Sequence, residues 1–171
     1  MILLDTAQGI PAYIPLLRPL ISPSSNVTIV LSHWHEDHVG GLPDVLRLLH
    51  ELGCPRPKVW KLPDAEGHRD EEVEAGLDGK EEAEWMEQAA NDEGLVSGGR
   101  ISRLHEGQVL KLLAEHGADP AAGRAEALPE LEVIHTPGHT SDSISLLLRT
   151  SPTSSPSPAA PPVLFTFDTG A

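Results

Sequence analysis

The segment Ser32–Gly41, which reads SHWHEDHVGG, constrains this chain more than any other stretch. It carries three histidines, His33, His35 and His38, together with the carboxylate Asp37. Side chains two residues apart on an extended segment point to the same side, so the first two histidines should face one spot. Converging nitrogen and oxygen donors suit Zn²⁺, or a related divalent ion such as Mn²⁺ or Fe²⁺. The segment therefore predicts a metal-binding loop.

The residues on either side of this loop predict a buried strand before it and a helix after it. Residues Val27–Leu31 are β-branched and apolar without polar alternation, which is typical of a strand buried on both faces. Pro43 is tolerated in a first helical turn and Gly53 is a suitable helix end. The histidines should thus lie at the carboxyl end of a buried strand, where open α/β sheets place their ligands. The apolar residues at helical spacing are Leu42, Val45, Leu46, Leu49 and Leu52.

Three further motifs accompany the histidine segment in a fixed order. They are Leu3–Gly9 (LLDTAQG), Thr136–Thr140 (TPGHT) and Val163–Gly170 (VLFTFDTG). With these motifs the chain resembles the metallo-β-lactamase superfamily, which implies an α/β fold, the four-layer αββα sandwich. Residues Pro11–Leu17 and the helix after the histidine motif are most similar to the lactamase-beta-like protein 2 group. Fungal thioesterases that release polyketides from acyl carrier protein are similar too.

The resemblance implies a two-metal site. It assigns His33, His35 and His139 to a first metal, Asp37 and His38 to a second, and Asp168 to a bridge between them. Asp5 is expected to support the metal loop rather than to bind the ion. The other histidines are expected to be ordinary surface or supporting residues.

The chain also departs from the family pattern. The family supplies one more histidine after the bridging aspartate and further strands before the first motif, whereas this sequence runs only from Met1 to Ala171. Ala7 stands where the family often has glycine, and Phe167 where it has a small residue. We therefore expect a single domain over 1–171 that forms a partial αββα sandwich, truncated at both ends.

Two segments read as insertions into this domain. The first, at about 63–99, is acidic: between Asp64 and Glu93 lie 13 of the 26 acidic residues, and a helix is expected around 81–90. The second, at about 150–162, is a Ser/Pro-rich linker. Between the two, Ile101–Leu113 turns at Glu106-Gly107 and predicts a pair of strands.

Composition bears on the compartment and the partners. Cys54 is the only cysteine, so no disulfide can form within the chain. No signal peptide and no apolar run of about 20 residues is visible, which predicts a cytoplasmic protein that does not associate with membranes. The oligomeric state is left open.

A site of this kind predicts hydrolysis by a metal-activated hydroxide, with Asp37 and Asp168 assisting catalysis. The resemblance favours a small-molecule or acyl-carrier-bound thioester or ester as the substrate, in polyketide biosynthesis. One alternative is a metal-dependent endoribonuclease, although a net charge of −14 disfavours nucleic acid as a partner. The other is an inactive fragment that binds at most one metal ion.

Overall fold

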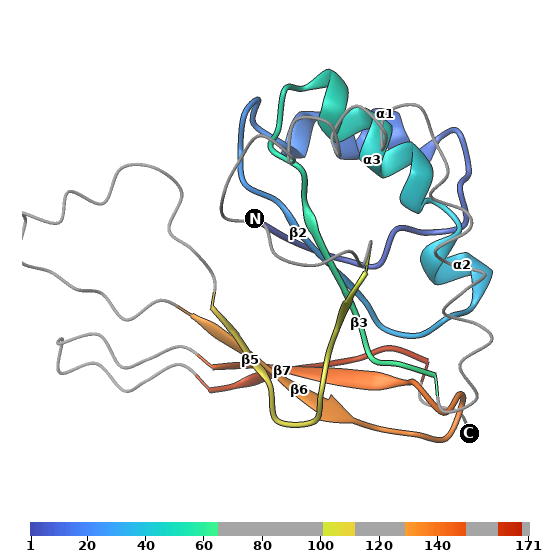
Figure 1. Ribbon diagram of the computed structural model, residues 1–171, viewed down its shortest axis with the longest axis vertical. Coiled ribbons are helices and arrows are strands. Elements are labelled where there is room, and N and C mark those ends of the chain that lie inside the picture. Colours follow the sequence, from blue (N-terminus) through green and yellow to red (C-terminus); the bar gives the residue numbers. More distant parts are fainter. Residues whose placement is uncertain (65–100, 112–128, 150–160, 169–171) are drawn as a thin grey trace, which may run out of the picture.

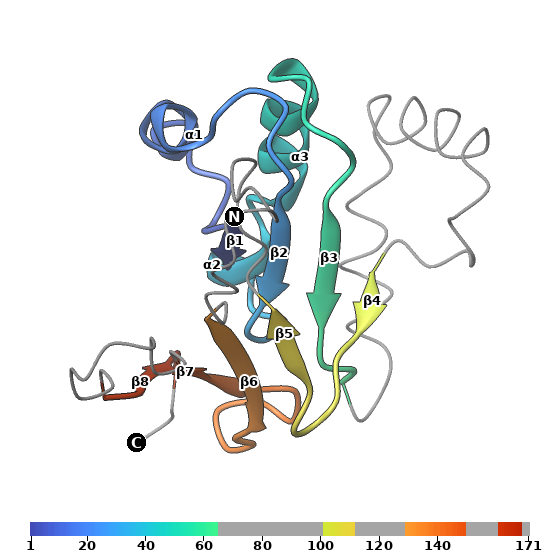
Figure 2. The same ribbon diagram turned by 90° about the vertical axis from the view of Figure 1, so that its left-hand side faces the viewer.

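The computed structural model describes residues 1–64, 101–111, 129–149 and 161–168. Their strands form two four-stranded sheets. In the first sheet all neighbouring strands are parallel, as Figure 2 shows. Its strands, in spatial order, are β1 (Ile2–Leu4), β2 (Thr28–Leu31), β3 (Lys58–Lys61) and β4 (Ser102–Arg103).

The helices lie on one side of this first sheet (Figure 1). They are α1 (Tyr13–Leu17), the short 3-10 helix η1 (Arg18–Leu20), α2 (Glu36–Val39) and α3 (Leu42–Glu51). The predicted helix after the histidine motif is confirmed: α3 has Pro43 in its first turn, and Gly53 follows it with φ +67°. None of the helices in the described part is long and apolar enough to cross a membrane.

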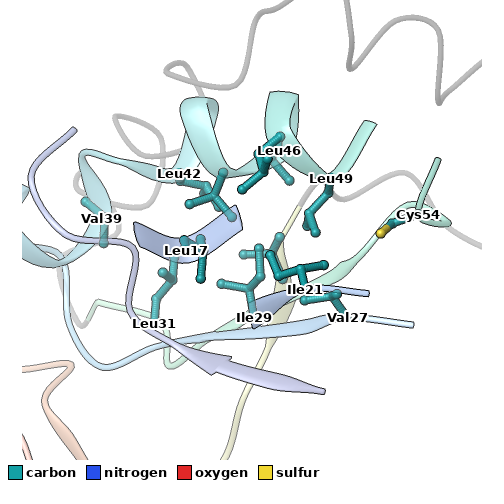
Figure 3. Close-up of a cluster of buried hydrophobic side chains, with 13 residues drawn as sticks. Leu17, Ile21, Val27, Ile29, Leu31, Val39, Leu42, Leu46, Leu49 and Cys54 are labelled. Carbon is teal, nitrogen blue, oxygen red and sulfur yellow. The ribbon is translucent and has the colours of Figure 1, made fainter. Parts of the chain in front are cut away.

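The second sheet is antiparallel and lies on the other side of the first (Figure 1). The predicted buried strand, β2, is what joins the two layers. Its Ile29 and Leu31 pack with the helices in the core drawn in Figure 3, while Val30 packs with the second sheet. The strands of the second sheet, in spatial order, are β5 (Val109–Lys111), β6 (Glu130–His135), β7 (Ile144–Arg149) and β8 (Val163–Thr166).

The described residues thus form three layers: helices, parallel sheet and antiparallel sheet. The expected α/β fold with two packed sheets is confirmed, and it is partial, because no described helix covers the outer side of the second sheet. Several apolar side chains on this sheet are accordingly exposed, namely Val109, Val163, Leu164 and Phe165. Phe167, which replaces a small residue of the family pattern, packs against the core between the sheets.

The predicted strand pair in 101–113 is wrong in its pairing. Both strands exist, but β4 pairs with β3 in the first sheet and β5 pairs with β6 in the second. The turn at Gly107, with φ +74°, therefore carries the chain from one sheet to the other rather than closing a hairpin. The acidic insertion and its expected helix at 81–90 lie outside the described residues, apart from 63–64, and so does the linker at 150–160.

Candidate metal centre

The predicted site residues come together from both sheets. His33 and His35 directly follow β2, and His38 lies in the single turn of α2. His139 lies in the loop between β6 and β7, and Asp168 follows β8. The histidine loop of the parallel sheet thus meets two segments of the antiparallel sheet.

Three imidazoles form the first group. The Nδ1 atom of His35 lies 3.1 Å from Nε2 of His33 and 2.8 Å from Nε2 of His139. These atoms can hold a metal ion together. Three nitrogens around a tetrahedral zinc ion would stand about 3.3 Å apart, so a shift of a few tenths of an ångström would fit the ion. Three neutral nitrogen donors leave a fourth position open, as catalytic zinc sites do.

A second group shares His33 and adds His38 and Asp168. The Oδ2 atom of Asp168 lies 3.4 Å from Nε2 of His38 and 3.8 Å from Nε2 of His139. This carboxylate of the second group therefore also lies close to a histidine of the first group. Asp37 belongs to neither group among the described residues; its side chain is 61% exposed, and its Oδ2 atom lies 3.7 Å from Nε2 of His38.

Asp5 supports both groups from behind. Its Oδ1 atom accepts a hydrogen bond of 2.7 Å from the backbone N–H of Ser32, and its Oδ2 atom accepts one of 2.8 Å from the Ser32 hydroxyl. Nδ1 of His38 lies 2.8 Å from the same Oδ2 atom, and Nδ1 of His33 lies 3.0 Å from Ser32 Oγ. With protons on both Nδ1 atoms, Nε2 of each ring keeps its lone pair for a metal, an arrangement common around metal-binding histidines.

Burial and neighbouring charge set the protonation of these groups. Desolvation, aided by the other three imidazoles and opposed by Asp142, lowers the pKa of His33 to about 4. His33 is therefore neutral at pH 7 and able to bind a metal. Burial acts to lower the pKa of His38 as well, but Asp5, Asp37 and Asp168 outweigh it and raise that pKa above its ordinary value. Burial raises the pKa of Asp5 despite its hydrogen bonds from His38 and Ser32.

The two glycines that end the histidine motif let the Asp5 loop pack directly on it. Thr6 donates to the carbonyl of His38 from its backbone N–H at 2.8 Å and from its hydroxyl at 3.0 Å. The backbone N–H of Gly41 donates to the carbonyl of Ala7 at 2.7 Å. A Cβ atom on Gly41 would lie 2.0 Å from the Thr6 carbonyl oxygen. Glycine is therefore required by the close approach of two backbones.

Sequence reasoning missed four residues that stabilise the site. Ser32 and Thr6 are small polar residues within the recognised motifs, and the sequence does not show that both are buried. Lys61 and Asp142 form a buried ion pair, which only the folded chain reveals. Among the other histidines, Nε2 of His135 lies 2.8 Å from the carbonyl of Ser141, beneath the metal loop.

A family model described as the Metallo-beta-lactamase superfamily matches residues 9–151. The protein named "Atrochrysone carboxyl ACP thioesterase nsrC" from Aspergillus novofumigatus is 39% identical over 62 residues, which cover 35% of this chain and 18% of that protein. "Lactamase-like protein ptaB" from Pestalotiopsis fici is 47% identical over 53 residues, or 30% of this chain and 17% of that protein.

Among solved structures, this chain is similar to BJP-1, a subclass B3 metallo-beta-lactamase of Bradyrhizobium japonicum. The TM-score is 0.54 at 20% identity, and the match covers 96% of this chain and 51% of the lactamase. At that identity the likeness concerns the fold alone. The chain spans about half the length of the lactamase. Its matched region spans less than a fifth of each fungal relative.

Proposed function

Because this chain belongs to the metallo-beta-lactamase superfamily, we propose that it is part of a metal-dependent hydrolase whose site is built from His33, His35, His139, His38, Asp37 and Asp168. The observation that supports this most directly is the convergence of three imidazoles: Nδ1 of His35 lies 3.1 Å from Nε2 of His33 and 2.8 Å from Nε2 of His139. Neutral nitrogen donors with a carboxylate beside them suit zinc.

When bound, a divalent ion supplies Lewis-acid polarisation of a carbonyl group and a water acidic enough to ionise near neutral pH. The first-group histidines hold the ion, and the neutral state of His33 at pH 7 keeps its lone pair available. Asp168 is half-exposed and lies beside both groups, so its carboxylate can orient the attacking water and accept its proton. In this proposal the exposed carboxylate of Asp37, close to His38, would bind a second ion or exchange protons with solvent.

We further propose that the substrate is a thioester or ester, either a small molecule or an acyl group bound to an acyl carrier protein. The support is the likeness to proteins named as atrochrysone carboxyl ACP thioesterases. The half-buried Trp34 ring packs edge-on against His35, with 4.3 Å between ring centroids, and offers one apolar wall beside the first group. An acyl chain would contact such a wall.

Elemental mass spectrometry of the purified, dialysed chain tests the metal site, and hydrolysis of a short acyl thioester of N-acetylcysteamine tests the activity. We expect one or two zinc ions per chain. His139→Ala should lose hydrolysis and the ion of the first group, whereas an ion held by His33, His38 and Asp168 can remain. His105→Ala is the matched control, because His105 is an exposed histidine in the turn between β4 and β5. An unchanged zinc content in His139→Ala would contradict the site. A metal-free wild-type chain without hydrolysis would favour an inactive fragment.

A further inference from the structure

A lysine and an aspartate are buried together next to the metal centre. Lys61, the last residue of β3, is 2% exposed, and Asp142, in the loop between His139 and β7, is 0% exposed. Nζ of Lys61 lies 2.6 Å from Oδ2 of Asp142 and donates to the carbonyl of Leu62 at 3.0 Å. The contact with Asp142 is an ion pair rather than a well-directed hydrogen bond, and Oδ1 of Asp142 has no hydrogen-bond partner in the described part of the chain.

Such a pair is a weak way to stabilise a core. Removing two charges from water is costly, and apolar residues of similar volume in the same place are often equally or more stabilising. The adjacent residues Leu62 and Ile144 are themselves buried in the apolar core between the sheets. An apolar pair would therefore pack well against these neighbours. Because the ion pair is not needed to fill this space, we infer that it has a role beyond the stability of the core.

Its position supplies that role. In the first group, His33 and His35 follow a strand of the parallel sheet, whereas His139 lies in a loop of the antiparallel sheet. The same loop is tied to the parallel sheet by two further contacts. The backbone N–H of Ile144 donates to the carbonyl of Ser32 at 3.1 Å, and the Ser141 hydroxyl donates to Oδ1 of Asp64.

The ion pair is the charged contact among these three. It joins the end of β3 to a residue three positions after His139, so it fixes that loop relative to the first sheet. The two other contacts lie on either side of Asp142 in the sequence, at Ser141 and Ile144. The charge of Asp142 also acts on the ring of His33, the ligand that both groups share.

We propose that Lys61 and Asp142 are positioning residues, whose ion pair holds the His139 loop at the distance from His33 and His35 that a metal ion requires. The proposal rests on the proposed metal-binding function. Groups bonded directly to metal ligands commonly change metal affinity by 10- to 100-fold, and the ion pair acts one step further out, through the loop that carries His139. An apolar substitute would fill the same space without fixing the register of the loop.

The test compares the wild-type chain with the double variant Lys61→Met/Asp142→Leu. The matched control is Arg149→Met/Glu132→Leu, which removes an exposed cross-strand ion pair of the same antiparallel sheet, with Nη2 and Oε2 2.6 Å apart. Zinc affinity is measured by competition with a chromophoric chelator, and the geometry of the site by the visible spectrum of bound Co²⁺. Folding is measured by urea unfolding with far-ultraviolet circular dichroism.

We expect the double variant to keep the wild-type urea midpoint, to bind zinc 10- to 100-fold more weakly and to show an altered Co²⁺ spectrum. The control should match the wild type in all three measurements. Wild-type zinc affinity in a folded double variant would overturn the proposal, and so would failure of the double variant to fold, since the pair would then serve the core itself. A wild-type chain that binds neither ion would instead refute the metal site.

Discussion

Substitution of one glycine in the histidine motif should disrupt the fold around the metal centre. In Gly41→Ala, the new Cβ atom would lie 2.0 Å from the carbonyl oxygen of Thr6, whereas real contacts of this kind are not shorter than 3.0 Å. The two backbones must therefore separate by about 1 Å. The neighbouring atoms belong to the main chain, so no side chain can rotate away to relieve the contact.

The free-energy cost follows from what this separation disrupts. Three hydrogen bonds join the Asp5 loop to the histidine motif: two from Thr6 to His38 and one from Gly41 to Ala7. Each contributes about 0.5–1.5 kcal/mol, and overpacking adds about 1–3 kcal/mol. A loss of about 5 kcal/mol in the free energy of unfolding is expected, which lowers Tm by about 10–20 °C in a chain of this size.

Gly138→Ala is the matched control, because Gly138 also stands in a metal-loop motif but has nothing within 4 Å of an added Cβ atom. Urea unfolding followed by circular dichroism should separate the two variants by several kcal/mol, and zinc content should fall only in Gly41→Ala. Equal stability of the two variants, within about 0.5 kcal/mol, would refute the reasoning from the close backbone approach.

Three further outcomes are expected. Ala7 has a left-handed backbone with φ +59°, so Ala7→Gly should raise the free energy of unfolding by about 0.5–1 kcal/mol in urea unfolding; a lower value would contradict the strain. Asp168→Asn should reduce zinc, measured by elemental analysis, towards one ion per chain, held by His33, His35 and His139; loss of all zinc would contradict two separable groups. In the metal-free chain, His33 stays neutral in the folded state down to a pKa of about 4, whereas in the unfolded chain it takes up a proton near 6.5. From this residue alone, stability should therefore fall by about 1.4 kcal/mol as the pH drops from 7.5 to 5.5, while the raised pKa of His38 acts in the opposite direction. The two are separated by measuring a His38→Gln variant, in which an unchanged urea midpoint over this range would contradict the prediction.

Local patterns predicted much of this fold. The strand 27–31 and the helix after Gly41 follow from hydrophobic periodicity and turn residues, and the structure confirms them. The convergence of His33, His35 and His139 was inferred from motif order, which carries more information than any single spacing. The glycine that the family often has at position 7 has a physical basis, because the backbone of Ala7 adopts the left-handed conformation that glycine favours.

Features that depend on pairing between distant segments could not be predicted. The turn at Gly107 looks the same in sequence whether its strands pair with each other or join different sheets, and here they join different sheets. The Lys61–Asp142 pair links segments that no local pattern relates. The assignment of Asp37 to the second metal stays a prediction: its side chain in α2 is 61% exposed, and its Oδ2 atom lies 3.7 Å from Nε2 of His38.

The strand that delivers Asp168 has a consequence for how the site fills. Among the described strands, β8 hydrogen-bonds to β7 alone, and all its residues are exposed. Fraying of this edge would withdraw Asp168 while leaving the first group, His33, His35 and His139, in place. If the edge were docked in about one molecule in ten, the second ion would bind about tenfold more weakly than to a docked strand. An ion bound there would in turn favour docking, so loading of the second position and closure of the sheet edge would form one linked equilibrium.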